Sequence, residues 1–136
     1  MNYWLVKSEP FKYSWEQFEK DKLTCWDGVR NYQARNNLRA MQKGDMALFY
    51  HSNEGLCIVG VAKVNRTSYP DPTADSPDWL AVDLKLLKRL KNPVTLATMK
   101  QDHQLTNLSL IKQGRLSVCP VRPEEFDRIL WLSEHG

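Results

Sequence analysis

Residues 26–41 have the sequence WDGVRNYQARNNLRAM, which places a tryptophan, a glycine and three arginines beside a short helical pattern. Asn31 is a residue type that caps helix N-termini, and apolar residues follow it at the spacing of one helix face. The predicted buried face consists of Ala34, Leu38 and Met41. We therefore expect a helix that begins after Asn31, packs against a core and keeps Arg35 on a polar side.

At the start of this stretch, the residues Trp26, Asp27 and Gly28 have no helical periodicity. Glycine permits a backbone angle or a close approach that a side chain would prevent. Tryptophan and arginine are the side chains that stack on planar rings and pair with phosphates. The segment therefore predicts the rim of a binding site. The alternative is that Trp26 is a core aromatic residue, Asp27 a turn residue and the arginines a solvated face.

The length and composition describe one globular domain over residues 1–136. The chain is 42% hydrophobic and 26% charged, as is usual for folded proteins, and it is long enough to form one core. Its net charge of +3 permits a polyanionic partner without requiring one. The three cysteines are far apart and form no Cys-x-x-Cys pair, so neither a disulfide framework nor a zinc site is predicted.

The chain has no amino-terminal signal pattern and no apolar run of about 18 residues. We therefore expect a cytoplasmic protein with no membrane partner and no metal. A monomer is favoured, although the sequence does not determine the oligomeric state.

The first half of the chain predicts a strand at 3–6, a helix at 15–21 capped by Ser14, and a strand at 46–51 after a helix-ending Gly44. A loop at 52–55 and an apolar strand at 56–64 complete a hairpin. Gly60 in the middle of that strand indicates a bulge, a barrel bend or the close approach of another backbone.

In the second half, the three prolines between residues 65 and 78 predict a long loop. An alternating strand begins at Leu80 and is expected to end at Pro93. Short helices are predicted at 95–100 and 105–113, a last strand at 115–121 and a terminal helix from Pro123. About five strands with short helices between them predict an α+β fold on a small, curved, mainly antiparallel sheet.

No sequence motif identifies catalytic chemistry. There is no Walker loop, no Gly-x-Ser-x-Gly elbow and no paired-histidine metal motif, and the three histidines are isolated from one another. His51 lies at a predicted strand end, where it or Asp27 could act as an acid or base on a nucleoside-like substrate. A metal site that includes His51 lacks a recognisable third ligand.

Aromatic residues do lie at strand ends and in loops, and basic residues accompany them. If the sheet curves so that these ends meet, they form an aromatic pocket with a basic mouth. A base held there gains about 1–3 kcal/mol from stacking, and it enters from a single strand or by flipping out of a duplex. A small-molecule or protein-interaction module with the same pocket is the third alternative. The residues concerned are Trp26, Tyr50, Tyr69, Trp79, Lys7, Arg30 and Arg115.

Several of these segments together resemble the EVE domain family. They are WLVKSEP at 4–10, WDGVRNYQARN at 26–36, FYHS at 49–52 with IVG at 58–60, YPD at 69–71 and RLSV at 115–118. The resemblance implies a PUA-like fold, a small β-barrel of about five mainly antiparallel strands flanked by short helices, related to YTH and ASCH domains. It also implies a non-catalytic module without cofactors that reads a modified base, such as a methylated cytosine or adenine derivative, in DNA or RNA.

The resemblance assigns roles to individual residues. By analogy with YTH readers, Trp26 would form one wall of the base pocket, and Tyr69 or Trp79 the second. Lys7 and Ser8 would contact the base edge. The full set of expected base-pocket residues is Lys7, Ser8, Trp26, Asp27, Gly28, Asn31, Tyr50, His51, Ser52, Tyr69 and Trp79. The expected phosphate contacts are Arg30, Arg35 and Arg115.

Overall fold

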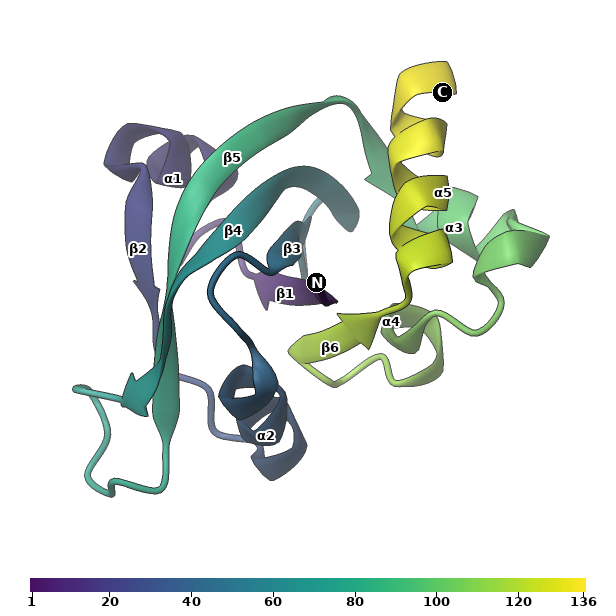
Figure 1. The fold of residues 1–136 in the computed structure, drawn as a ribbon. Coiled ribbons are helices and arrows are strands. Elements are labelled where there is room, and N and C mark those ends of the chain that lie inside the picture. Colours follow the sequence, from purple (N-terminus) through teal and green to yellow (C-terminus); the bar gives the residue numbers. More distant parts are fainter.

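A mixed sheet of six strands forms the centre of the protein in the computed structural model, which describes residues 1–136 (Figure 1). The strand order across the sheet is β2-β5-β4-β3-β1-β6. Only β1 and β3 pair in parallel, and the other four pairings are antiparallel. The strands are β1 (Tyr3–Ser8), β2 (Leu23–Trp26), β3 (Met46–His51), β4 (Cys57–Pro70), β5 (Leu80–Thr95) and β6 (Val118–Val121). The α+β class and the mainly antiparallel pairing are confirmed.

The sheet is curved but is not a closed barrel, so this part of the prediction is wrong. β2 pairs only with β5 and β6 only with β1, and each of these edge strands is four residues long. Register shifts in the β3–β4 and β4–β5 pairings bend the long strands, which arch over β1 and β3 (Figure 1). The curvature therefore comes from bulges, and the edges remain unpaired.

Short helices are placed around the sheet, and their starts follow the predicted caps. Ser14, Asn31 and Thr95 each accept a backbone N–H of the first helical turn. The helix at 32–40 ends with Met41 as its C-cap, so Gly44 lies in the following turn and does not end the helix. The helices are α1 (Trp15–Asp21), α2 (Tyr32–Ala40), α3 (Leu96–Gln101), the 3₁₀ helix η1 (His103–Leu105), α4 (Ser109–Lys112) and α5 (Pro123–His135).

Two proline predictions need correction because β4 and β5 are longer than expected. β4 continues to Pro70, which lies opposite Leu80 of β5, so the connecting loop covers only 71–79. Pro93 does not end β5. It lies between the paired residues Arg89 and Val94, where the register shifts and the missing N–H breaks no regular ladder.

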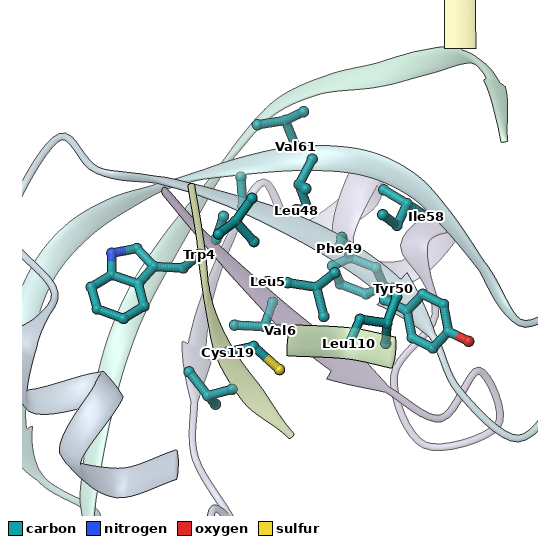
Figure 2. Close-up of a cluster of buried hydrophobic side chains, with 14 of the residues drawn as sticks. Trp4, Leu5, Val6, Leu48, Phe49, Tyr50, Ile58, Val61, Leu110 and Cys119 are labelled. Carbon is teal, nitrogen blue, oxygen red and sulfur yellow. The ribbon is translucent and has the colours of Figure 1, made fainter. Parts of the chain in front are cut away.

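The core is one continuous cluster that includes the predicted face of α2, because Ala34, Leu38 and Met41 are buried. Gly60 allows the indole of Trp15 to lie against β4, since a Cβ atom on Gly60 would fall 2.2 Å from that ring. The register shifts beside Gly60 confirm the predicted bulge, whereas the group that approaches Gly60 closely is a side chain and not the expected backbone. Figure 2 shows part of the core, formed by Trp4, Leu5, Val6, Leu48, Phe49, Tyr50, Ile58, Val61, Leu110 and Cys119. None of the helices combines the length and hydrophobicity needed to cross a membrane.

Candidate functional site

A cavity of about 740 Å³ lies where the ends of β1 and β2 meet the segments 27–30 and 114–117. Ligand-binding pockets usually have volumes of about 300–1,000 Å³, so this cavity has room for a nucleobase or a molecule of similar size. Its lining is mostly polar. The residues are Lys7, Ser8, Glu9, Lys12, Tyr13, Thr24, Cys25, Trp26, Asp27, Gly28, Val29, Arg30, Ser52, Gly114, Arg115 and Ser117.

Two aromatic residues, Trp26 and Tyr13, line this cavity. Trp26 is only 8% exposed, and its ring packs edge-on against Phe49 at 5.6 Å between centroids. Tyr13 lies nearly perpendicular to Trp26, with the centroids 6.3 Å apart. The indole therefore forms part of the cavity wall within an aromatic cluster. Tyr13, for which no role was predicted, supplies the second aromatic side chain.

The end of β1 brings two polar residues to the cavity. Ser8 donates its hydroxyl to the Tyr13 carbonyl oxygen at 2.5 Å, so the hydroxyl oxygen remains available only as an acceptor. Lys7 donates from Nζ to the Gly114 carbonyl oxygen at 2.7 Å, and burial lowers the pKa of Lys7. These contacts join β1 to the Tyr13 and Gly114 segments and fix both side chains at the cavity wall.

Asp71 organises the rim of the cavity, although no role was predicted for it. Its buried carboxylate accepts the backbone N–H of Gly28 at 2.8 Å and the Arg30 guanidinium at 2.9 Å. It also accepts the N–H and the hydroxyl of Thr73, at 2.7 and 2.6 Å. The pattern of an Asp with a Thr two residues later is that of an Asx turn, which is the sequence signal that could have identified it.

The electrostatics of Asp71 follow from these contacts. Burial alone would raise the pKa of Asp71, but hydrogen bonds from Thr73, Arg30 and Gly28 outweigh burial and hold the pKa well below its usual range. Gly28 itself has φ +78°, a backbone conformation that side chains disfavour. A charged, buried carboxylate thus holds the left-handed turn of the rim in place.

Basic groups outnumber acidic groups in the lining of the cavity. The lining contains four basic residues, Lys7, Lys12, Arg30 and Arg115, and two acidic ones, Glu9 and Asp27. Arg30 is paired with Asp71, and Lys12 lies 3.5 Å from Glu9 in an exposed pair. Arg115 is exposed and forms no ion pair. It is therefore the basic residue of the rim with the most freedom to bind an external anion.

The structure brings most of the predicted contacts together at this cavity. They are Lys7, Ser8, Trp26, Asp27, Gly28, Ser52, Arg30 and Arg115. The lining also contains residues for which sequence reasoning made no prediction, namely Glu9, Lys12, Tyr13, Thr24, Cys25, Val29, Gly114 and Ser117. Thr24 and Cys25 belong to β2, the strand that was not predicted.

Three other predicted base contacts lie outside the cavity and have structural partners. Asn31 caps α2 by accepting the Ala34 N–H at 2.9 Å, and Tyr50 is 3% exposed in the core. The His51 Nε2 atom accepts the Trp15 N–H at 3.2 Å, and burial lowers the pKa of this imidazole. His51 is therefore bound to the start of α1.

The remaining three predicted residues, Tyr69, Trp79 and Arg35, also lie beyond the lining. The Tyr69 hydroxyl donates to Asp83 and lies 3.0 Å from Cys25 Sγ. Burial raises the pKa of Tyr69, and the contacts with Asp83 and Cys25 raise it further. Trp79 stacks on Tyr32, and Arg35 donates to the Asp78 carbonyl oxygen at 3.1 Å. Tyr69 or Trp79 was expected to form the second wall, but neither is among the residues that line this cavity.

The chain contains no group of three or more His, Cys, Asp or Glu side chains positioned to hold a metal ion. Cys25, Cys57 and Cys119 are all free thiols. The lining residues offer a ligand hydrogen bonds, aromatic faces and charged groups.

Comparison with solved structures first places the architecture in the PUA-like class. The YTH domain of Zygosaccharomyces rouxii MRB1 protein, solved in complex with N6-methyladenosine RNA, superposes with a TM-score of 0.63 at 13% identity, over 97% of this chain and 86% of that one. At this identity the match concerns the fold alone.

The family model of the EVE domain matches residues 2–132, and the chain belongs to this family. Rat thymocyte nuclear protein 1 is 41% identical over 98% of this chain and 74% of its own length. A crystal structure of a protein from Agrobacterium tumefaciens has a TM-score of 0.94 at 46% identity, covering 98% of this chain and 93% of that one. Human THYN1 protein in complex with 5-methylcytosine containing DNA has a TM-score of 0.92 at 38% identity, covering 98% of each chain.

The comparisons also correct the prediction of a cytoplasmic protein. The vertebrate relatives from rat, human and mouse are all named thymocyte nuclear protein 1. The cytoplasmic assignment, which rested on the lack of a signal pattern, is therefore wrong, because a nuclear protein also lacks such a pattern.

Proposed function

We propose that this protein is a non-catalytic module that binds a modified base of DNA or RNA in the cavity beside Trp26. The observation that carries the proposal is the cavity itself, which combines two aromatic side chains with an excess of basic groups. Aromatic faces bind the ring of a base, and basic groups at the mouth bind the phosphates that flank it. The human relative in complex with 5-methylcytosine containing DNA supports the same interpretation.

The polar groups of the lining favour a base with an exocyclic amine. Ser8 presents a hydroxyl oxygen as an acceptor, and the Asp27 carboxylate can accept from an amine such as N4 of cytosine or N6 of adenine. A methylated cytosine or adenine derivative offers such an amine together with an apolar group for the aromatic side. Uracil and thymine lack this amine and have only their N3–H to donate to the carboxylate.

The absence of catalysis is part of the proposal. The imidazole of His51 is bound to the Trp15 N–H and does not line the cavity, which removes the best candidate for an acid or base. The modified base has to come from a single strand or flip out of a duplex, and flipping costs a few kcal/mol. Single-stranded probes should therefore bind more tightly than duplexes of the same sequence.

The test is fluorescence anisotropy at low salt with matched oligonucleotides that carry 5-methylcytosine, 5-hydroxymethylcytosine, N6-methyladenine or no modification. We expect one modified probe to bind more tightly than its unmodified counterpart. Trp26→Phe should weaken that preference with the fold intact, whereas Trp131→Phe, an exposed tryptophan outside the cavity, should leave it unchanged. Equal binding of every probe by the wild-type protein would overturn the proposal.

A further inference from the structure

A stack of four side chains lies next to the cavity, with Arg30 and Tyr32 exposed and Arg35 and Trp79 half-buried. Tyr32 and Trp79 stack with their ring centroids 4.9 Å apart and an interplanar angle of 29°. Arg30 has its guanidinium carbon 5.8 Å from the Trp79 ring, and Arg35 has its own 5.1 Å from the Tyr32 ring. We call Arg30, Trp79, Tyr32 and Arg35 the outer stack.

The outer stack is ordered but remains open to solvent. Tyr32 is the first residue of α2 and is 63% exposed although its ring is stacked. Arg35 is fixed by its bond to the Asp78 carbonyl oxygen at 3.1 Å, and the Trp79 carbonyl oxygen accepts the Asp71 N–H at 2.9 Å. Two aromatic rings that are held in place but not buried offer a planar surface at little cost in conformational freedom.

The outer stack is continuous with the cavity through two residues. Arg30 lines the cavity and also lies over Trp79. Asp71 binds the Arg30 guanidinium with its side chain and the Trp79 carbonyl with its backbone N–H. A strand whose base occupies the cavity would therefore pass Arg30 on its way to the outer stack.

Resting on the proposed function, we infer that the outer stack is a second nucleotide site, which binds a base next to the captured one in the same single strand. Aromatic faces stack on any base, and guanidinium groups bind phosphates, so the stack matches both parts of a nucleotide. The incoming base takes the place of Arg35 over the Tyr32 ring, which breaks the Arg35 hydrogen bonds to the Asp78 carbonyl oxygen and the Asn36 side chain. The displaced guanidinium then pairs with the phosphate of that nucleotide.

The test compares two probes that differ in length. One is a single strand of about seven nucleotides with a central 5-methylcytosine, and the other is the nucleoside 5-methyl-2′-deoxycytidine, which reaches only the cavity. We expect Tyr32→Ala to lower affinity for the strand by about 5- to 30-fold and to leave nucleoside binding unchanged. Tyr32→Phe keeps the ring and should bind both probes as the wild type does.

The possible results separate this inference from the function on which it rests. A wild-type protein that does not distinguish the modified strand from the unmodified one contradicts the reader function. A wild-type preference that persists while Tyr32→Ala binds the strand at full affinity contradicts only the second site. An equal loss for the strand and the nucleoside also overturns the second site, since Tyr32 would then act by shaping the start of α2. Thermal unfolding of Tyr32→Ala checks that the fold is intact.

Discussion

The Asp71 carboxylate accepts the backbone N–H of Gly28 at 2.8 Å, across 43 positions of the sequence. The same carboxylate accepts the Arg30 guanidinium, so the loop between β4 and β5 holds both the turn and the first arginine of the cavity rim. In Figure 1 this loop extends beyond the sheet at the tip of the β4–β5 hairpin. The shape of the rim therefore depends on a residue far from it in sequence.

Replacing this carboxylate should destabilise the fold at neutral pH. Asp71→Asn keeps the size of the side chain but removes the charge that its donors and Arg30 face, so we expect a loss of about 1–3 kcal/mol in the free energy of unfolding. Urea denaturation at pH 7 measures it. Asp75→Asn, an exposed position in the same loop, is the control and should have little effect.

The cost of Asp71→Asn should also depend on pH. In the folded protein the pKa of Asp71 is held below its usual range, whereas in the unfolded protein this carboxyl titrates at about 3.9. The stabilisation is therefore fully present above the unfolded pKa and is lost as the pH falls through the lower, folded pKa. The difference in unfolding free energy between wild type and variant should shrink below about pH 4. A difference that is the same at pH 7 and pH 3 would contradict this account.

The two arginines at the cavity should respond differently to neutralisation. Arg115 forms no ion pair, whereas Arg30 is paired with Asp71. If Arg115 contacts a phosphate, Arg115→Gln should lower the slope of log affinity against log salt by about 0.7 to 0.9 without changing stability. Arg30→Gln should reduce stability as well, because it leaves the buried carboxylate without its charged partner.

Binding titrations at several salt concentrations measure these slopes, and urea denaturation measures the stabilities. Lys112→Gln, an exposed charge outside the cavity, is the matched control for Arg115→Gln. The assignment of Arg115 to a phosphate is wrong if the two variants have the same slope.

The sequence predicted helix starts well because capping is local. The cap residues Ser14, Asn31 and Thr95 lie within three positions of the N–H groups that they bind. β2 was missed because its four residues show no alternation, and it is a strand because it pairs with β5. The end of β4, residues 65–70, was likewise read as part of a proline-rich loop, since it is stabilised mainly by its pairing with β5.

The candidate site was predicted only in part, for the same reason. Trp26 and Lys7 were found because tryptophan and lysine at element ends indicate binding chemistry. Tyr13 and Asp71 were missed because their roles depend on contacts with distant segments, as in the bond from Asp71 to Gly28. Trp79 was predicted as a pocket wall, yet the turn of the hairpin places its ring against Tyr32.

The contact between Gly60 and Trp15 should tolerate no extra carbon atom. A Cβ at position 60 would lie 2.2 Å from the Trp15 ring, so Gly60→Ala forces the indole or β4 to move. We expect a loss of about 1–3 kcal/mol in unfolding free energy, the usual cost of overpacking. Urea denaturation measures the change.

A double-mutant cycle identifies the cause of that loss. In a Trp15→Leu background the methyl group of Ala at position 60 meets a smaller side chain, so Gly60→Ala should cost less there than in the wild type. Equal costs in both backgrounds would place the damage in the β4 backbone and not in the Trp15 contact.

His51 should make stability fall in mildly acidic solution. Its Nε2 atom accepts the Trp15 N–H at the start of α1, which requires a neutral ring, and burial lowers the pKa of His51. The unfolded imidazole titrates at about 6.5, so this contribution is fully present above that pH and is lost as the pH falls through the lower, folded pKa.

The variant His51→Gln tests this account, because it keeps a hydrogen-bond acceptor but does not titrate. Unfolding free energies of both proteins between about pH 7.5 and 5 should therefore converge as the pH falls, because only the wild type has to exclude a proton from this ring. Parallel curves would mean that the His51 to Trp15 bond does not control stability in this range.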